Sequence, residues 1–234
     1  RKHENPSLGQ ALSDIATFAL WMQKAGYRAS TTSGSVKALK AVARRTNLQD
    51  SEAVKAYLAS AKLSESRKEK VADDLARFYR YKHISFEKPY YKRIERLPFI
   101  PLDNEIDQLI SGAGRKTGTF LQFLRETAAR PGEAWNLQWF DLDRERSCVR
   151  ITPEKNGRPR ERRVSFRLMS MLQNLRHNGI HVFHDDDVDP AESLEHFRRN
   201  FLRQRRKVAE KLQNPRILHI TFGTLRHFAA SLEY

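Results

Sequence analysis

The sequence predicts a mainly α-helical protein with a small β-sheet, divided into two domains. Apolar residues recur at the spacing of a helix through most of the chain. One Asn-Gly pair, Asn156-Gly157, lies between two short segments that alternate apolar and polar residues, which is the pattern of a β-hairpin. The length of 234 residues is enough for one large domain or two small ones, and a proline-containing segment before residue 99 favours two.

Four short helices are expected in the first domain, which we assign to residues 1–82. They span residues 8–25, 35–46, 51–60 and 65–82. The first carries apolar residues at i, i+3, i+4 and i+7 from Leu8 to Met22, which predicts one buried stripe. Breaks are expected at Gly26 and over Ser30–Gly34, where turn-forming residues gather.

Residues 83–98, HISFEKPYYKRIERLP, are expected to link the domains, because Pro89 and Pro98 interrupt any helix. The second domain, residues 99–234, is expected to combine helices with two strands. Its helices are expected at 103–111, 117–128, 167–176, 190–212 and from 222 onward, and its strands at 147–152 and 161–166.

The charge of the chain indicates an anionic partner. There are 43 Lys and Arg against 28 Asp and Glu, a formal net charge of +15, and nucleic acid is the commonest polyanion. A charged face on any single helix is more often simply solvated, but four basic helices in a row favour a surface that faces DNA. The candidate DNA contacts are Lys37, Lys40, Arg44, Arg45, Arg158, Arg160, Arg198 and Arg199.

The composition also excludes several classes of protein. The single cysteine, Cys148, excludes an internal disulfide, makes a zinc cluster implausible and fits a reducing compartment. No stretch approaches the roughly 20 apolar residues of a membrane span, and the first residues lack a signal-peptide apolar region. We expect a cytoplasmic protein associated with the nucleoid.

Three stretches can carry chemistry. In TAARPGEAWNLQW, Pro131 suits the first turn of a helix and biases Arg130 toward an extended backbone at the positive end of the helix dipole. An arginine there is repelled by the dipole unless an anion lies between them, so the arrangement favours phosphate binding. Glu133 can orient the guanidinium or complement the dipole. Taken alone, a surface arginine before a helix is the commoner interpretation.

The second stretch is the hairpin VRITPEKNGRPRERRVSF. Asn156-Gly157 is typical of a type I′ turn, which places Lys155 at the tip. Val149 and Ile151 on one strand, and Val164 and Phe166 on the other, are expected to share a buried face. A cationic tip can reach a phosphodiester, although a solvated basic hairpin is the simpler alternative.

The third stretch, LHITFGTLRHFAASLEY, predicts an amphipathic helix with Thr221 as its N-cap and with Arg226 and His227 near its start. An acidic run before the preceding helix, HDDDVDP, lacks the central glycine and terminal glutamate of a calcium loop. Asp189-Pro190 is instead expected to be the N-cap and first turn of that helix.

Together these stretches resemble the tyrosine recombinases, also called the phage integrase family. The resemblance rests on the R-x-G-E helix start followed by W-x-D-x-D (Arg130 to Asp143), the lysine-tipped hairpin and the I-T-x-x-x-L-R-H helix, in that order. It covers nearly the whole chain, with 1–82 similar to the helical core-binding domain and 99–234 to most of the mixed α+β catalytic domain. The ITF-x-TLRH pattern is most similar to archaeal members.

The resemblance implies a site-specific DNA recombinase or integrase that cuts and rejoins duplex DNA through a 3′-phosphotyrosine. Arg130 and Arg226 would clamp the phosphodiester, supported by Glu133, and Lys155 would protonate the leaving 5′-oxygen. Such enzymes use neither a metal nor a nucleotide cofactor, and they assemble as tetramers on paired sites. No membrane is involved.

The sequence departs from the family pattern at two points. Gly223 occupies the position, three residues before Arg226, where the family usually has histidine. Proton transfer is lost there, or His219 or His227 supplies it, or the residue has been changed deliberately. The family places its nucleophilic tyrosine a few tens of residues beyond the second arginine. Here only Tyr234 follows Arg226, and its spacing is unfavourable. We therefore expect a truncated recombinase that binds DNA without cleaving it.

Two alternatives remain. One is a non-catalytic DNA-binding regulator that keeps the recombinase fold and the arginines. The other is a basic RNA-binding protein, which the lack of aromatic stacking motifs disfavours.

Overall fold

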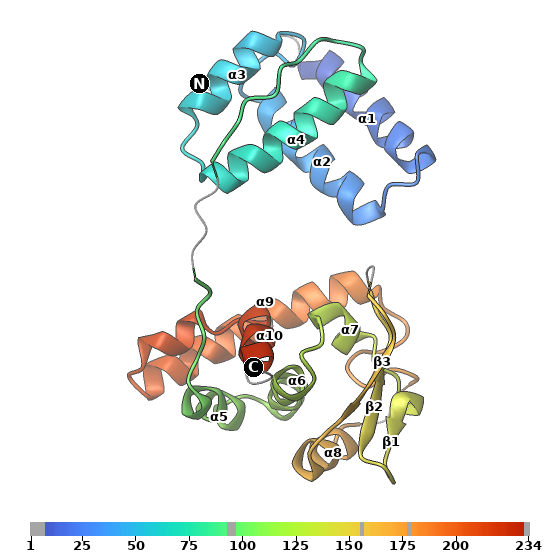
Figure 1. Cartoon of the computed structure of the whole chain (residues 1–234), viewed down its shortest axis with the longest axis vertical. Coiled ribbons are helices and arrows are strands. Elements are labelled where there is room, and N and C mark those ends of the chain that lie inside the picture. Colours follow the sequence, from blue (N-terminus) through green and yellow to red (C-terminus); the bar gives the residue numbers. More distant parts are fainter. Residues whose placement is uncertain (1–7, 93–96, 155–156, 177–178, 232–234) are drawn as a thin grey trace. The chain divides into compact units, whose positions relative to one another are not determined.

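The computed structural model describes residues 8–92, 97–154, 157–176 and 179–231 and divides the chain into two compact units, Arg1–Arg96 and Leu97–Tyr234 (Figure 1). The expectation of a mainly α-helical chain with a small sheet is confirmed. No helix in the described ranges combines the length and the apolar character that crossing a bilayer requires.

The regular secondary structure in the described part of unit 1 is all helical. Its helices are α1 (Leu8–Lys24), α2 (Ala29–Ala43), α3 (Ser51–Ser60) and α4 (Glu65–Tyr81). The side chains of Asp50 and Ser64 cap α3 and α4 by accepting hydrogen bonds from backbone N–H groups of the first turn. The helices enclose an aromatic core in which Phe18 contacts Phe78 edge to face, with ring centroids 5.5 Å apart.

The expected break over Ser30–Gly34 is wrong, because α2 begins at Ala29 and includes these residues. The reason is tertiary: Thr32 and Ser35 are buried, and Ser35 Oγ donates to Asp74 Oδ1 on α4 at 2.7 Å. Packing against a neighbouring helix thus outweighs the weak helix propensity of this Ser/Thr/Gly segment.

Part of the expected linker belongs to unit 1. Ile84, Phe86 and Tyr91 pack against its core, and the ring of Phe86 stacks on Tyr79 at 4.6 Å. Lys88 Nζ binds Glu69 at 2.6 Å and Asp73 at 2.8 Å, both on α4. The first unit therefore extends beyond residue 82.

Unit 2 combines helices with a three-stranded sheet. Its elements are α5 (Asp103–Gly112), α6 (Arg115–Thr127), α7 (Pro131–Trp135), η1 (Trp139–Asp141), β1 (Leu142–Asp143), β2 (Cys148–Ile151), β3 (Arg160–Arg163), α8 (Phe166–Gln173), α9 (Pro190–Lys211), η2 (Pro215–His219) and α10 (Phe222–Ser231). The predicted caps are confirmed: Asp189 accepts from Glu192 N–H at the start of α9, and Thr221 accepts from Thr224 N–H at the start of α10.

The sheet is antiparallel in the order β1-β2-β3, with Val149 opposite Leu142 on one side and Arg162 on the other. Val149, Ile151 and Val164 are buried as expected. Phe166 is not: β3 ends at Arg163, and Phe166 begins α8 with 83% of its surface exposed. Strand β1 was not predicted, since two residues give no readable alternation.

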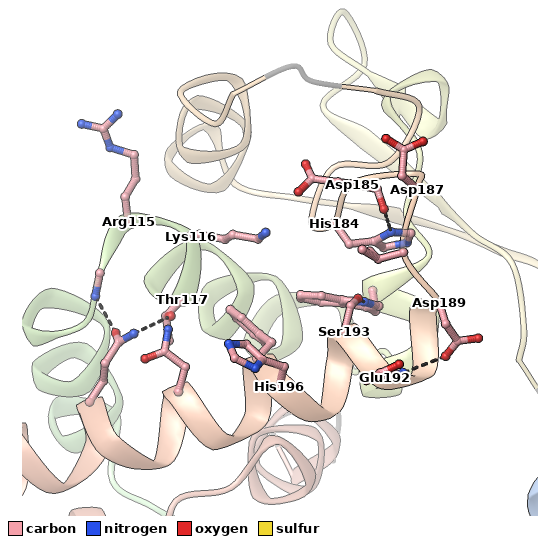
Figure 2. A pocket seen from close by; sticks show the side chains of 16 residues that line it. Arg115, Lys116, Thr117, His184, Asp185, Asp187, Asp189, Glu192, Ser193 and His196 are labelled. Atoms are coloured by element: carbon pink, nitrogen blue, oxygen red, sulfur yellow. Dashed lines mark hydrogen bonds between the residues drawn. The ribbon is translucent and has the colours of Figure 1, made fainter.

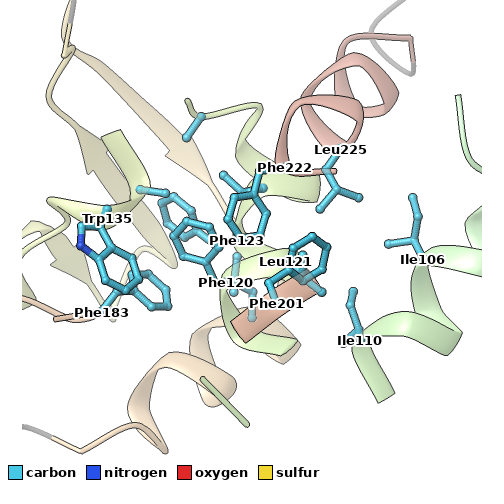
Figure 3. Packing of buried hydrophobic residues seen from close by; sticks show 14 of the residues in the cluster. Ile106, Ile110, Phe120, Leu121, Phe123, Trp135, Phe183, Phe201, Phe222 and Leu225 are labelled. Atoms are coloured by element: carbon cyan, nitrogen blue, oxygen red, sulfur yellow. The ribbon is translucent and has the colours of Figure 1, made fainter. Parts of the chain in front are cut away.

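Helix α6 forms the centre of unit 2. Phe120, Leu121, Phe123 and Leu124 are all fully buried, and the ring of Phe120 lies 5.0 Å from that of Phe222 on α10 (Figure 3). Gly118 lets α5 approach, because a Cβ there would lie 2.9 Å from the carbonyl oxygen of Ile110. Helices α7, α9 and α10 all contact this core, so side chains near the start of α7 and of α10 are held on a rigid base.

Candidate functional site

The candidate site begins where α6 leads into α7. Ala128 ends α6 in the left-handed region, with φ 52°, and Arg130 is extended, with φ −69° and ψ 150°, as Pro131 predicts. Helix α7 spans only five residues, so its dipole is small. Any attraction for an anion at this point therefore depends on charged side chains.

Glu133 joins two arginines beside the start of α7. Its side chain has no solvent exposure, and its Oε1 accepts a hydrogen bond from Arg130 Nη1 at 2.9 Å. Oε2 accepts from the backbone N–H of Arg130 at 2.9 Å and from Arg160 Nη2 at 2.7 Å. Burial by itself would raise the pKa of Glu133, but these hydrogen bonds outweigh it and lower the pKa below its ordinary value. The carboxylate is thus ionised and fixes both guanidinium groups.

Arg226 brings a third guanidinium to the same place. Burial lowers its pKa, and the nearby charges of Arg130 and Arg160 lower the pKa further, while Glu133 opposes them. Its guanidinium forms no hydrogen bond or ion pair with any residue that the structure describes. An arginine stays protonated at any physiological pH, so Arg130 and Arg160, which pair with Glu133, and Arg226, whose charge interacts with all three, leave an excess of two positive charges. We call these four residues the arginine cluster.

The last helix is fixed where it presents Arg226. Thr221 and Thr224 cap its start reciprocally, and Leu225 and Phe228 bury the opposite side against the core. Gly223 lies one turn before Arg226 on the same face. A Cβ at Gly223 would contact only Thr221 Oγ1, at 3.6 Å, so the backbone leaves room there for a larger side chain.

The loop end of the β2–β3 hairpin is tied to the cluster through Arg160, and the loop after β2 lies over the start of α7. A Cβ at Gly132 would fall 2.2 Å from Glu154 Oε2, so the carboxylate of Glu154 lies directly over this glycine of the R-P-G-E motif. Lys155 and Asn156, the expected hairpin tip, lie outside the described residues, as does Tyr234.

The remaining predicted residues are distributed over both units. Arg130, Glu133 and Arg226 come together, whereas His227 is exposed on α10, and the ring of His219 packs against Phe99 at 5.5 Å. Neither histidine forms a hydrogen bond with the arginine cluster among the described side chains. The exposed candidate DNA contacts are Lys37, Lys40, Arg44, Arg45, Arg158, Arg198 and Arg199.

Arg160 is the exception among those candidates. It was expected to contact DNA, but its guanidinium donates to the buried carboxylate of Glu133. The register of the sheet accounts for this, because Arg160 lies opposite the buried Ile151 and residues opposite each other share a face.

Comparisons with known proteins give the family and the fold. Residues 102–232 match the family model described as the phage integrase family. The structure of lambda integrase (residues 75–356) as a dimer bound to a COC′ core site has a TM-score of 0.67 at 13% identity, covering 94% of this chain and 88% of that one.

The integrase of transposon Tn1549, in complex with transposon right-end DNA, has a TM-score of 0.68 at 14% identity, covering 94% of this chain and 85% of that one. At such identities the likeness shows the fold. A search of curated proteins gives no match. Since the family model spans more than half of its length, the chain belongs to the phage integrase family, the tyrosine recombinases.

Proposed function

We propose that this protein is a site-specific DNA recombinase or integrase in which Arg130 and Arg226 clamp one phosphodiester of duplex DNA. The observation that carries the proposal is the arginine cluster, with three guanidinium groups around one buried carboxylate. Forked guanidinium donors match the non-bridging oxygens of a phosphate. Arg130 is held by Glu133 yet keeps a third of its side chain exposed, which leaves donors free for a ligand.

The arrangement favours phosphoryl transfer. In the reaction of this family, a tyrosine hydroxyl attacks phosphorus, the bond to the 5′-oxygen breaks, and the 3′-phosphate is left on the tyrosine. Fixed positive charge lowers the energy of the crowded, highly charged transition state. Lys155, at the expected hairpin tip, would protonate the leaving 5′-oxygen. Arg160 would add charge beside the clamp, held by the same carboxylate as Arg130.

DNA contacts would extend over both units. The exposed Lys37 and Lys40 on α2 and Arg44 directly after it give unit 1 a basic surface, and Arg198 and Arg199 on α9 give unit 2 another. A lambda integrase tetramer has been solved bound to a Holliday junction, and this chain covers 71% of that one. We extend the same expectation of self-association on paired DNA sites to this protein.

Salt dependence of DNA binding tests the clamp. Removing one phosphate contact lowers the slope of log K against log salt by about 1. Arg130→Ala and Arg226→Ala should each weaken binding to a duplex and lower this slope. Arg146→Ala is the matched control, because Arg146 is exposed and pairs with Glu161 at the far end of the hairpin strands. If Arg130→Ala and Arg146→Ala change the slope alike, the clamp is wrong.

The proposed reaction needs a tyrosine nucleophile near the arginine cluster. Every tyrosine in the described part of the chain belongs to unit 1, and only Tyr234 lies in the second unit. We expect a protein of this sequence to bind DNA without forming a covalent adduct. A detergent-resistant protein–DNA band on denaturing gels, abolished by Tyr234→Phe, would overturn that expectation.

A second candidate function, a DNA-binding regulator without catalysis, is favoured by Gly223. Glycine has no group that transfers a proton, and it stands on the helix face that carries Arg226. The two functions differ in what restores cleavage. A longer chain that supplies a tyrosine should cleave DNA if the protein is an enzyme, and should still only bind if it is a regulator.

A further inference from the structure

A second polar site in unit 2 shares no residue with the arginine cluster. It borders a pocket of about 840 Å³ between the start of α6, the loop before α9 and α9 itself (Figure 2). The residues that matter here are on the loop, where His181, His184 and Asp186 each offer a ligand atom within 4.8 Å of the others.

The loop is held in place on both sides. The backbone N–H of Val182 donates to the carbonyl oxygen of Leu137 at 2.9 Å, and the backbone N–H of Trp139 donates to the carbonyl oxygen of Ile180 at 3.0 Å. The ring of His184 stacks between Trp135, at 5.7 Å, and His181, at 4.2 Å. Both imidazoles are therefore positioned before any ligand arrives.

The hydrogen bonds indicate which nitrogens are available. His184 Nδ1 lies 2.9 Å from the carbonyl oxygen of Asp185, an acceptor, so Nδ1 carries the proton and Nε2 carries the lone pair. His184 is 6% exposed, and its Nε2 is buried without a hydrogen-bond partner among the described residues. A buried lone pair without a donor is costly unless something binds it.

The carboxylate beside the histidines is held by two contacts. Asp186 accepts from the backbone N–H of Ile180 at 2.6 Å and pairs with His181 Nδ1. A metal ion bound by both side chains would take the place of the proton that His181 Nδ1 and Asp186 share, because an imidazole nitrogen binds a metal in its deprotonated form.

We propose that His181, His184 and Asp186 bind a divalent transition-metal ion, for which Zn²⁺ is the best match. Imidazole and carboxylate suit Zn²⁺, and three protein ligands plus a water complete a tetrahedron. The single cysteine of the sequence excludes a zinc site built from several thiolates. The site proposed here has two imidazoles and one carboxylate as ligands and needs no thiolate. Asp185 and Asp187, which line the same pocket, add negative charge nearby. Its cations are Arg115 and Lys116, and Lys116 lies over the ring of Trp135 and interacts with the charge of Asp185.

The ion would act as a structural clip. The three ligands lie within six residues of one another, immediately before Asp189 caps α9. Metal binding would join the strand-like segment at residues 180–182 to the turn that starts α9. This role does not involve the arginine cluster. The metal-site proposal can therefore be tested independently of the recombinase function.

The test uses the whole chain, freed of metal with a chelator, and titrates Zn²⁺ by calorimetry with Co²⁺ absorption as a second readout. We expect one saturable site and the d–d spectrum of four-coordinate Co²⁺. His184→Gln and His181→Gln should each weaken the affinity by about 10-fold or more. His196→Gln is the matched control, because His196 lines the same pocket on α9 and is exposed.

Thermal unfolding distinguishes the clip from adventitious binding. Zn²⁺ should raise the Tm of the wild-type chain and of His196→Gln, and should leave the Tm of His181→Gln unchanged. His181 is partly exposed, so its variant keeps the test valid if the buried His184 variant fails to fold. Equal Zn²⁺ affinity in the wild type and in His181→Gln, or no saturable site at all, would refute the proposal.

Discussion

Two buried glutamates in unit 2 cap the helices α5 and α7 in the same way, but their electrostatic surroundings differ. Glu105 and Glu133 each occupy the third position of a helix, and each accepts a hydrogen bond at 2.9 Å from the backbone N–H of the residue before that helix. Each also pairs with an arginine from a distant segment, Arg216 at 2.8 Å and Arg160 at 2.7 Å. In both, this pairing satisfies the charge of a carboxylate that is almost fully buried.

The difference lies in what else surrounds the carboxylate. At α5 the residue before the helix is Leu102, and one glutamate faces one arginine. At α7 the corresponding residue is Arg130, and Arg226 approaches as well. The first arrangement is electrically balanced and serves the fold. The second keeps positive charge in excess, which is unfavourable without an anion and is therefore expected at a binding site.

The largest effect should come from removing each carboxylate. Glu133→Gln leaves three guanidinium groups close together without their counter-charge, and we expect it to lower the free energy of unfolding of unit 2 by about 3 kcal/mol. Glu105→Gln should cost about 1 to 2 kcal/mol, because Arg216 is half exposed and water can solvate it. Urea unfolding followed by tryptophan fluorescence measures both.

This comparison contains its own control. Adding duplex DNA should recover part of the stability of Glu133→Gln, because phosphates replace the missing negative charge, and should do nothing specific for Glu105→Gln. Equal losses and equal recovery in the two variants would mean that the arginine cluster is an ordinary structural ion pair.

The helices and the R-P-G-E motif could be predicted from the sequence, because both depend on local patterns of residues. Periodicity found the helices, and the caps at Asp189 and Thr221 were correct. The start of α2 was not found, since burial of Thr32 and Ser35 against α4 decides it. Long-range packing of this kind leaves no local signal.

The same distinction applies to the sites. Arg130 and Glu133 are neighbours in the chain, so their pairing was readable. Arg160 joins Glu133 from 27 residues away, and its side depends on the sheet register. The His181–His184 pair escaped notice because its basis is a stack on Trp135, which only the folded chain brings together.

The next prediction concerns acid. The pKa values of Glu105 and Glu133 are both lowered from 4.5: burial alone would raise each, but the hydrogen bonds from arginine and backbone prevail. The folded state therefore binds fewer protons than the unfolded state near pH 4.5. Their stabilising contributions are complete above that pH and are lost as the pH falls through the lowered folded values.

Unfolding free energy measured at a series of pH values checks this. The wild-type chain should lose stability as the pH falls below about 4.5, and each Gln variant should show a shallower slope, by up to one proton. Phosphate ions should raise the free energy of unfolding of the wild type at acid pH. The arginine cluster keeps its positive charge when Glu133 is protonated, whereas protonation of Glu105 leaves no comparable cluster for phosphate to bind. An unchanged slope in both variants would mean that neither carboxylate titrates differently on folding.

The smallest effect is expected from Gly223→His, which adds the group that the family usually has on the face of Arg226. A Cβ there has room, and histidine is no worse than glycine in a helix, so the free energy of unfolding should change by less than about 0.5 kcal/mol. The neighbouring guanidinium groups should keep the new imidazole neutral to a lower pH than usual, which NMR titration of its ring protons measures. Bound duplex DNA should raise that pKa, because the phosphate offsets the arginine charges. If the pKa of this imidazole is the same with and without DNA, residue 223 lies outside the clamp. The charge balance around Glu133 would then not influence proton transfer at this position.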